Sequence, residues 1–195
     1  MEYNNIGYTR IMYSHIPMID TFTTFDGKRL TLEGVLKEIV DFVAEDTESR
    51  YRIIVTTDSP GREGKDLVIP FSTVITIHRI GRGGRVLIHR SIRDDIYTFR
   101  DRIYRETVLS ITLAQELRVG LKHYIHEDYL LSENFEIHAD VGQNGKSRQM
   151  VREVEGMIIG SGFHVKIKPE AVGVRIADRF VRPAYRVSQP IFKTA

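Results

Sequence analysis

The chain of 195 residues contains no cysteine, which excludes disulfide bonds, thiolate metal sites and cysteine nucleophiles. It also has no apolar run long enough to span a bilayer, and its first residues lack the basic and then apolar pattern of a signal peptide. We therefore expect a cytoplasmic protein with no membrane association. The remaining composition is that of an ordinary globular protein, long enough to bury a sizeable core.

The net charge of +2 is too small to indicate a partner, but the charges are unevenly spread. Eight arginines lie between Arg79 and Arg105, against three acids in the same stretch, and further arginines follow from Arg175 to Arg186. Such clustering fits contacts with nucleic-acid phosphates. A solvated face with intramolecular ion pairs is the alternative, and at this point both remain open.

Apolar periodicity predicts an α/β fold between two irregular ends, an arm over 1–30 and a tail over 183–195. Thr31 can cap an extra N-terminal helix over 31–44. Three strands joined by short loops then predict an antiparallel meander, after which helices and strands alternate. The order is a helix followed by βββαβαβα, with five strands in a mixed sheet. The predicted strands are 51–57, 67–78, 85–89, 134–139 and 164–168, and the later helices are 98–119, 146–159 and 171–181.

Two of the predicted strands end on an aspartate. Asp58 ends the first strand, and Asp140 ends the fourth; a loop that contains glycine follows each. A charge at the end of a buried strand is costly unless something pairs with it. The repeated arrangement therefore suggests carboxylates that come together around a cation.

Two helices add further acids. On a helical wheel Glu106 falls within the apolar arc of the long helix, where a carboxylate stays ionised only beside a cation. Glu106 is therefore the third candidate for the site, although an ion pair with Arg102 or Arg105 is an alternative. Asp178 in the last helix is the fourth candidate. It is included because the four acids follow one another along the chain on the first strand, the long helix, the fourth strand and the last helix.

The set of segments resembles the ribonuclease H-like superfamily and, more closely, its YkuK-type bacterial branch. The resemblance covers roughly 31–182 and rests on the order of strands and helices together with several short segments. These are Ile54-Val55-Thr56-Thr57-Asp58-Ser59, Arg105-Glu106-Thr107, His138-Ala139-Asp140-Val141-Gly142, Lys168-Pro169-Glu170-Ala171 and Ala177-Asp178.

The resemblance implies a nuclease that holds two Mg²⁺ or Mn²⁺ ions about 3.5–4 Å apart and hydrolyses phosphodiester bonds in RNA or DNA. By position, Asp58 would bridge both ions and Asp140 would bind one, while Glu106 and Asp178 would complete the shells. Oxygen ligands suit these hard cations. Some members of the superfamily bind nucleic acid without cutting it, so a non-catalytic binding module of the same fold is the alternative function.

Three basic residues are candidates for contacts with nucleic-acid phosphates: Lys146, Arg100 and Arg105. Lys146 follows a strand and opens a helix, as in a P-loop, but the required spacing puts the first glycine where Asp140 stands. A carboxylate there would repel the phosphates of a nucleotide, so we expect no nucleotide cofactor. His138 shares a strand face with Asp140; a proton-shuttling role is conceivable, but a hydrogen-bonded structural histidine is favoured.

Overall fold

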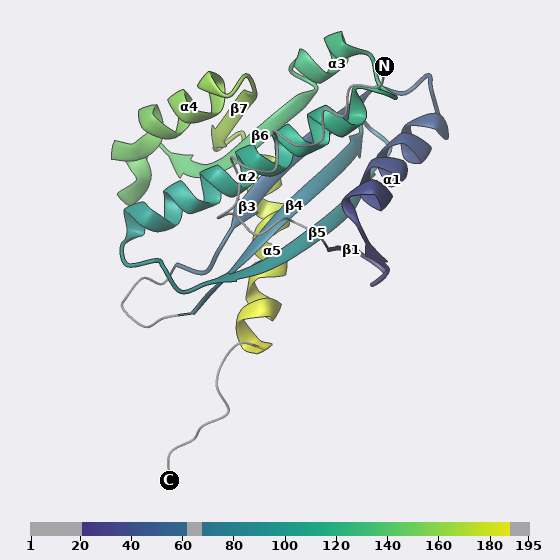
Figure 1. The fold of residues 1–195 in the computed structure, drawn as a ribbon. Helices are drawn as coiled ribbons and strands as arrows, with labels where there is room; N and C mark the ends of the chain where they lie inside the picture. The colour runs from purple at the N-terminus through teal and green to yellow at the C-terminus, as the bar shows by residue number, and fades with distance from the viewer. Residues whose placement is uncertain (1–20, 62–67, 188–195) are drawn as a thin grey trace, which may run out of the picture.

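One mixed sheet of seven strands forms the centre of the structure, which is a computed structural model that describes residues 21–61 and 68–187 (Figure 1). The strand order across the sheet is β2-β1-β5-β4-β3-β6-β7. The strands are β1 (Phe22–Thr24), β2 (Arg29–Leu30), β3 (Tyr51–Asp58), β4 (Ile69–Arg79), β5 (Gly84–Arg93), β6 (Phe135–Gly142) and β7 (His164–Lys168).

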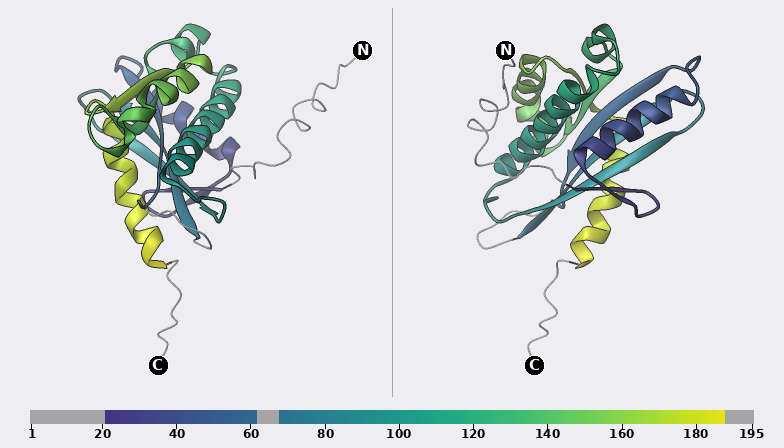
Figure 2. Two further views of the ribbon diagram at one scale, coloured as in Figure 1. Left: turned by 90° about the vertical axis from the view of Figure 1, so that its left-hand side faces the viewer. Right: turned by 45° about the vertical axis from the view of Figure 1, so that its right-hand side comes forward.

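The helices lie on both faces of this sheet (Figure 2). Helices α1, α2 and α4 pack on one face around the main apolar core, and α5 packs on the other face. Ala177 of α5 contacts Val74 and Ile88 of the sheet. The helices are α1 (Leu32–Ala44), α2 (Phe99–Leu121), α3 (Glu127–Leu131), α4 (Val151–Gly160) and α5 (Val172–Val187), with a 3-10 turn η1 (Lys146–Met150).

Strands β3, β4 and β5 form the predicted antiparallel meander. The turn between β4 and β5 uses Gly81 and Gly83, which both adopt positive φ angles that glycine reaches without steric cost. Strand β6 then pairs in parallel with β3, and β7 pairs in parallel with β6. As a result, β3 and β6 are neighbours inside the sheet, and their carboxyl ends lie at the same edge.

Helix α2 carries Glu106 into the protein interior. The residue at which the helix starts and the direction of its apolar face together determine which side chains point inward. Thr98 and Asp101 form a reciprocal capping box, in which each side chain accepts a hydrogen bond from the backbone N–H of the other residue. From that start, the helical repeat buries Ile103, Leu113 and Glu106 against the sheet. The burial of Glu106 is therefore set by the same periodicity that builds the core.

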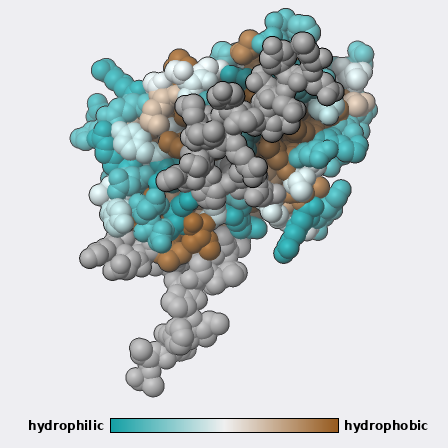
Figure 3. All heavy atoms as spheres, viewed as in Figure 1, coloured by the Kyte–Doolittle hydropathy of each residue, from teal (hydrophilic) through white to brown (hydrophobic). Residues whose placement is uncertain are grey.

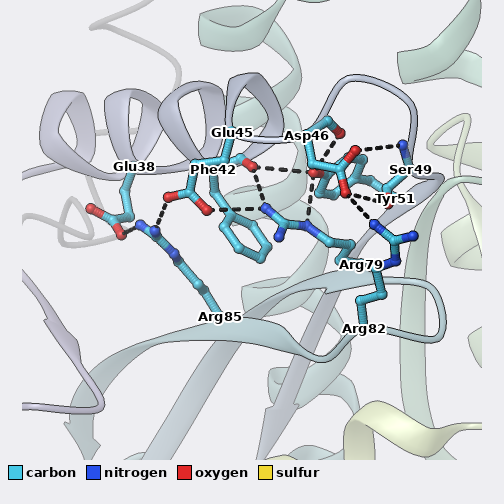
Figure 4. Close-up of polar contacts among 9 residues, drawn as sticks. All are labelled: Glu38, Phe42, Glu45, Asp46, Ser49, Tyr51, Arg79, Arg82 and Arg85. Carbon is cyan, nitrogen blue, oxygen red and sulfur yellow. Dashed lines mark hydrogen bonds and ion pairs between the residues drawn. The ribbon is translucent and has the colours of Figure 1, made fainter.

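Helix α1 is held to the far end of the meander by arginines (Figure 4). The Arg79 guanidinium lies 4.3 Å from the ring centroid of Phe42 and donates hydrogen bonds to the Tyr51 hydroxyl, the Phe42 carbonyl and Glu45. Arg85 lies over the same Phe42 ring and pairs with Glu38 of α1 and with Glu45, which follows the helix as its C-cap. These arginines of the basic stretch therefore serve intramolecular ion pairs, as the alternative reading of that stretch proposed.

The structure corrects several of the predicted elements. The sheet has seven strands rather than five, because β1 and β2 form inside the arm predicted to be irregular. These strands are too short to show a period in the sequence, yet β1 pairs with β5 and buries Phe22 completely. The short helix α3 was not predicted. Residues 1–20 of the arm lie outside the described residues.

Two predicted helices have different bounds. The helix predicted over 146–159 is divided into η1 and α4, and α5 continues to Val187, five residues past the predicted end of the domain at Arg182. Pro183 suggested an end to that helix, because a proline in a helix interior removes a backbone N–H donor and crowds the carbonyl four residues before it, but α5 continues past Pro183. The rest of the tail, 188–195, lies outside the described residues.

The surface is mostly polar. Figure 3 shows that the face viewed in Figure 1 is largely hydrophilic, with small hydrophobic patches between the charged side chains. Within the parts of the chain that the structure describes, no helix is both long and apolar enough to cross a membrane.

Candidate functional site

Asp58 and Asp140 lie at the ends of the two central parallel strands. The register pairs Val55 of β3 with Ile137 of β6, and three residues further along each strand stand Asp58 and Asp140. Asp58 is 6% exposed, and one of its oxygens accepts a 2.9 Å hydrogen bond from the backbone N–H of Ser59. The two strand ends therefore bring two carboxylates to one edge of the sheet.

The charge on Asp58 is poorly compensated. Burial, as the largest cause, and the negative charge of Asp140 together raise its pKa to about 7. Asp178 of α5 also raises the Asp58 pKa, while Arg102 opposes the rise. Asp58, Asp140 and Asp178 are thus close enough to repel one another, and the cluster carries an excess of negative charge.

Glu106 adjoins this cluster from the opposite side. It is 4% exposed, and its Oε1 atom accepts hydrogen bonds from the Ser59 hydroxyl at 2.6 Å and from Arg102 at 2.7 Å. Burial raises the Glu106 pKa to about 8, against the opposing effect of Arg102, and the charges of Asp58 and Asp140 raise it too. The ion pair with Arg102, considered from the sequence as an alternative, is present; Arg105 instead pairs with Asp95.

The other two acids reach solvent. The Asp140 side chain is 21% exposed and forms an ion pair with Lys168, the last residue of the neighbouring strand β7. Asp178 lies half-buried on α5. Nothing in the sequence marked Lys168 as a partner, because the pairing depends on the parallel alignment of β6 with β7.

The donor set of this cluster suits a hard divalent cation, since it consists of carboxylate and hydroxyl oxygens. The Ser72 hydroxyl adds to it: this fully buried group lies directly opposite Asp58 in the β3–β4 register and has no hydrogen-bond partner in the described part of the chain. The side chains are not drawn together around a point, however. Across residues 21–61 and 68–187, no group of three or more His, Asp or Glu side chains is arranged to hold a metal ion.

His138 has a structural environment. It is 2% exposed; its Nε2 atom lies 2.6 Å from Glu136 Oε2, and its Nδ1 atom accepts a 2.9 Å hydrogen bond from the backbone N–H of Gly173. Both ring nitrogens are therefore engaged with protein groups, so His138 joins β6 to the first turn of α5. This is the structural role that the sequence favoured.

The three predicted phosphate-binding residues have different surroundings. Lys146 is exposed at the start of η1. Arg100 pairs with Glu153 at 2.7 Å, and Arg105 is held by Asp95. Other exposed basic residues lie on β7 and α5, the elements that carry or adjoin Asp140 and Asp178, and include Lys166, Lys168, Arg175 and Arg179.

Comparison with known proteins agrees with this fold. A family model described as "Ribonuclease H-like" matches residues 34–182. The chain is also similar to a Bacillus subtilis (strain 168) protein named "Uncharacterized protein YkuK", with 28% identity over 177 residues that cover 85% of this chain and 100% of the relative. No solved structure matches the chain. The resemblance to the YkuK-type branch is confirmed, and the chain belongs to the ribonuclease H-like family.

Proposed function

We propose that this protein binds nucleic acid and hydrolyses its phosphodiester bonds with a divalent metal ion, Mg²⁺ or Mn²⁺, at the carboxylate cluster. The observation that carries the proposal is the convergence of Asp58, Asp140 and Asp178 at one edge of the sheet, where each added charge raises the Asp58 pKa. Such an excess of negative charge around the buried Asp58 is relieved by a bound cation. Family membership supports a fold associated with nucleic acid.

The residues have separate parts in this proposal. Asp58, Asp140 and Asp178 would hold the metal, which when bound activates a water molecule and stabilises the leaving oxygen of the phosphodiester. Asp58 is held in place by the Ser59 N–H, and Lys168 screens Asp140 until a cation binds. The Ser59 hydroxyl also binds Glu106, so one short turn after β3 aligns two of the four acids.

The nucleic acid would lie along the exposed basic residues beside the cluster. Arg175 and Arg179 are exposed on α5, within one turn of Asp178 on the same helix. Lys166 is exposed on β7, the strand next to Asp140. Cations at these places would contact phosphates on either side of the scissile bond, and such contacts make binding dependent on salt.

Nucleic-acid binding without turnover is the second candidate, and one observation favours it. Arg102 already neutralises Glu106 through a buried ion pair of 2.7 Å, so the acid that would complete a metal shell is bound to a protein cation. Because Arg102 neutralises the buried charge of Glu106, the fold can be stable without a catalytic metal ion. The two candidates differ in whether the bound strand is cut.

Cleavage and binding assays separate the two functions. The full chain is incubated with labelled single- and double-stranded RNA and DNA in Mn²⁺ or Mg²⁺, beside Asp58→Asn, Asp140→Asn and the control Asp41→Asn, which changes an exposed acid on α1. Catalysis predicts products from the wild type and the control only. Cleavage that persists in Asp58→Asn would refute the proposed site, and salt-sensitive binding with no products under either metal would support the second candidate.

A further inference from the structure

A guanidinium group lies inside the carboxylate cluster. Arg102 is 6% exposed and stands one helical turn before Glu106 on α2. Its NH1 atom lies 2.7 Å from Glu106 Oε1 and 3.4 Å from the Ser59 carbonyl oxygen, and its guanidinium carbon lies 5.1 Å from the ring centroid of Phe99. The ring and the polar groups together hold this positive charge in one place.

We propose that Arg102 is a built-in cation that replaces one of the two metal ions expected of the fold. The centre then binds a single divalent ion through Asp58, Asp140 and Asp178, and Glu106 stays outside the coordination shell of that ion. This inference rests on the proposed function in one respect: it takes from that function the binding of a divalent ion at the cluster. It concerns how many ions bind, and cleavage is a separate question.

The contrast between the two protein cations of the cluster supports this assignment. Lys168, the partner of Asp140, has a side chain that is 54% exposed, so it can turn into solvent and release its carboxylate to a metal. Arg102 and Glu106 have side chains that are only 8% and 5% exposed. Removing one partner from such a buried pair leaves an uncompensated charge in the interior, which is strongly unfavourable. Asp140 is therefore available to a metal ion, and Glu106 is not.

The effect of Arg102 on the neighbouring acids and the position of the Ser72 hydroxyl also support a single metal ion on the Asp58 side. Arg102 opposes the repulsion at both Asp58 and Glu106, as a metal ion placed beside these two acids would. On the Asp58 side, by contrast, the buried Ser72 hydroxyl has no hydrogen-bond partner in the described residues. Residues directly opposite in antiparallel strands share a face, so this oxygen lies beside Asp58 and is open to an ion or its bound water.

Titration of the full chain with Mn²⁺ tests the proposal. Calorimetry gives the number of ions bound per chain, and electron paramagnetic resonance gives the concentration of free Mn²⁺. We expect one ion in the wild type and a loss of affinity greater than about 100-fold in Asp58→Asn, because even outer-shell changes cost about 10–100-fold. Glu106→Gln should still bind one ion and should lose no more than the about 10–100-fold that an outer-shell change costs. Arg102→Met keeps an unbranched chain against Phe99 and should admit a second ion.

Further variants make the result specific. The second ion of Arg102→Met should disappear in the double variant Arg102→Met/Glu106→Gln, and the control Arg105→Met on the same helix should bind one ion. Two ions in the wild type, none in the wild type, or loss of the ion in Glu106→Gln would each overturn the proposal. If Arg102→Met does not fold, Glu106→Gln decides. One bound ion without cleavage would support this inference while refuting the proposed nuclease, and two ions with cleavage would do the reverse.

Discussion

The Nδ1 atom of His138 accepts a 2.9 Å hydrogen bond from the backbone N–H of Gly173, which joins the central strand β6 to the first turn of α5. The contact requires that α5 come very close to the sheet. A Cβ atom at position 173 would overlap the Thr56 hydroxyl and would lie 3.0 Å from both His138 Nδ1 and Ile54 Cγ2. The absence of a side chain at Gly173 therefore allows α5, and with it Asp178, to approach the aspartates of the sheet.

Gly173→Ala should destabilise the protein for this reason. The added methyl group meets buried side chains that have no room to move, and overpacking of this kind costs about 1–3 kcal/mol. Gly156→Ala is the matched control, because Gly156 lies exposed in α4 with nothing within 4 Å of its added Cβ. Alanine is the better helix former, so the control should gain about 0.5–1 kcal/mol. Urea unfolding followed by circular dichroism measures both changes; equal stability of the two variants would contradict the close approach.

His138→Ala should cost more than the loss of one ordinary hydrogen bond. The histidine contributes to holding the Glu136 pKa below its usual range although burial of Glu136 acts in the opposite direction. Without it, Glu136 remains 1% exposed, and among the described residues Arg52, at 3.6 Å, and the exposed Lys166 are the positive charges that act on it. We expect a loss of about 3 kcal/mol, as for a broken buried pair. Glu136→Gln/His138→Ala should recover part of that loss in the same unfolding assay, and no recovery would refute the explanation.

Stability in the absence of divalent metal should fall as the pH rises through neutrality. The pKa of Asp58 is raised from 3.8 to about 7 and that of Glu106 from 4.5 to about 8. Between the ordinary and the raised values the folded chain keeps protons that the unfolded chain has released, so each group lowers the free energy of unfolding by up to ~1.4 kcal/mol per pH unit.

Urea unfolding in EDTA from pH 5 to 8.5 measures this slope. Asp58→Asn removes one titrating group and should flatten the curve over the lower part of the window, to about pH 7, whereas Asp41→Asn should leave the curve unchanged. Added Mn²⁺ should restore stability most strongly at the alkaline end, where both acids are ionised. A variant curve parallel to that of the wild type would show that Asp58 is not the titrating group.

Arg79→Met should loosen α1 from the sheet. Arg79 combines three hydrogen-bonded partners with a stacked aromatic ring (Figure 4), so we expect a loss of about 2 kcal/mol. Arg82→Met is the control: the Arg82 side chain is 70% exposed and pairs only with Asp46 among the described residues, so its loss should stay below about 1 kcal/mol. Thermal unfolding compares the two, and a larger effect at Arg82 would contradict this assignment.

Nucleic-acid binding should depend on the exposed arginines of α5. If Arg175 and Arg179 contact phosphates, Arg175→Ala/Arg179→Ala should weaken binding on every sequence and lower the salt dependence of log K by roughly one unit per lost contact. Lys37→Ala changes an exposed lysine on the opposite side of the sheet and serves as the control. Fluorescence anisotropy at several salt concentrations gives both quantities; an unchanged slope would place the nucleic acid elsewhere.

Much of the architecture could be predicted because it depends on local periodicity. The apolar run of β3 and the helical repeat of α2 put Asp58 at a strand end and Glu106 on a buried face before any tertiary contact is known. Strand β7 was predicted with its observed bounds, and Thr31 was identified as the cap of α1. Strands β1 and β2 could not be found in this way, since they are too short to show a period and are stabilised by pairing with β5.

The order of strands and helices, the absence of thiol chemistry and the place of each acid along its element thus follow from residue types and spacing. The choice of partners does not: Glu106 pairs with Arg102 rather than Arg105, and Asp140 pairs with Lys168. Those pairings, and the raised pKa of Asp58, depend on which distant side chains packing brings within a few ångströms and on how deeply it buries them. Coulomb energy and desolvation both vary steeply with distance and burial, so only the folded structure decides them.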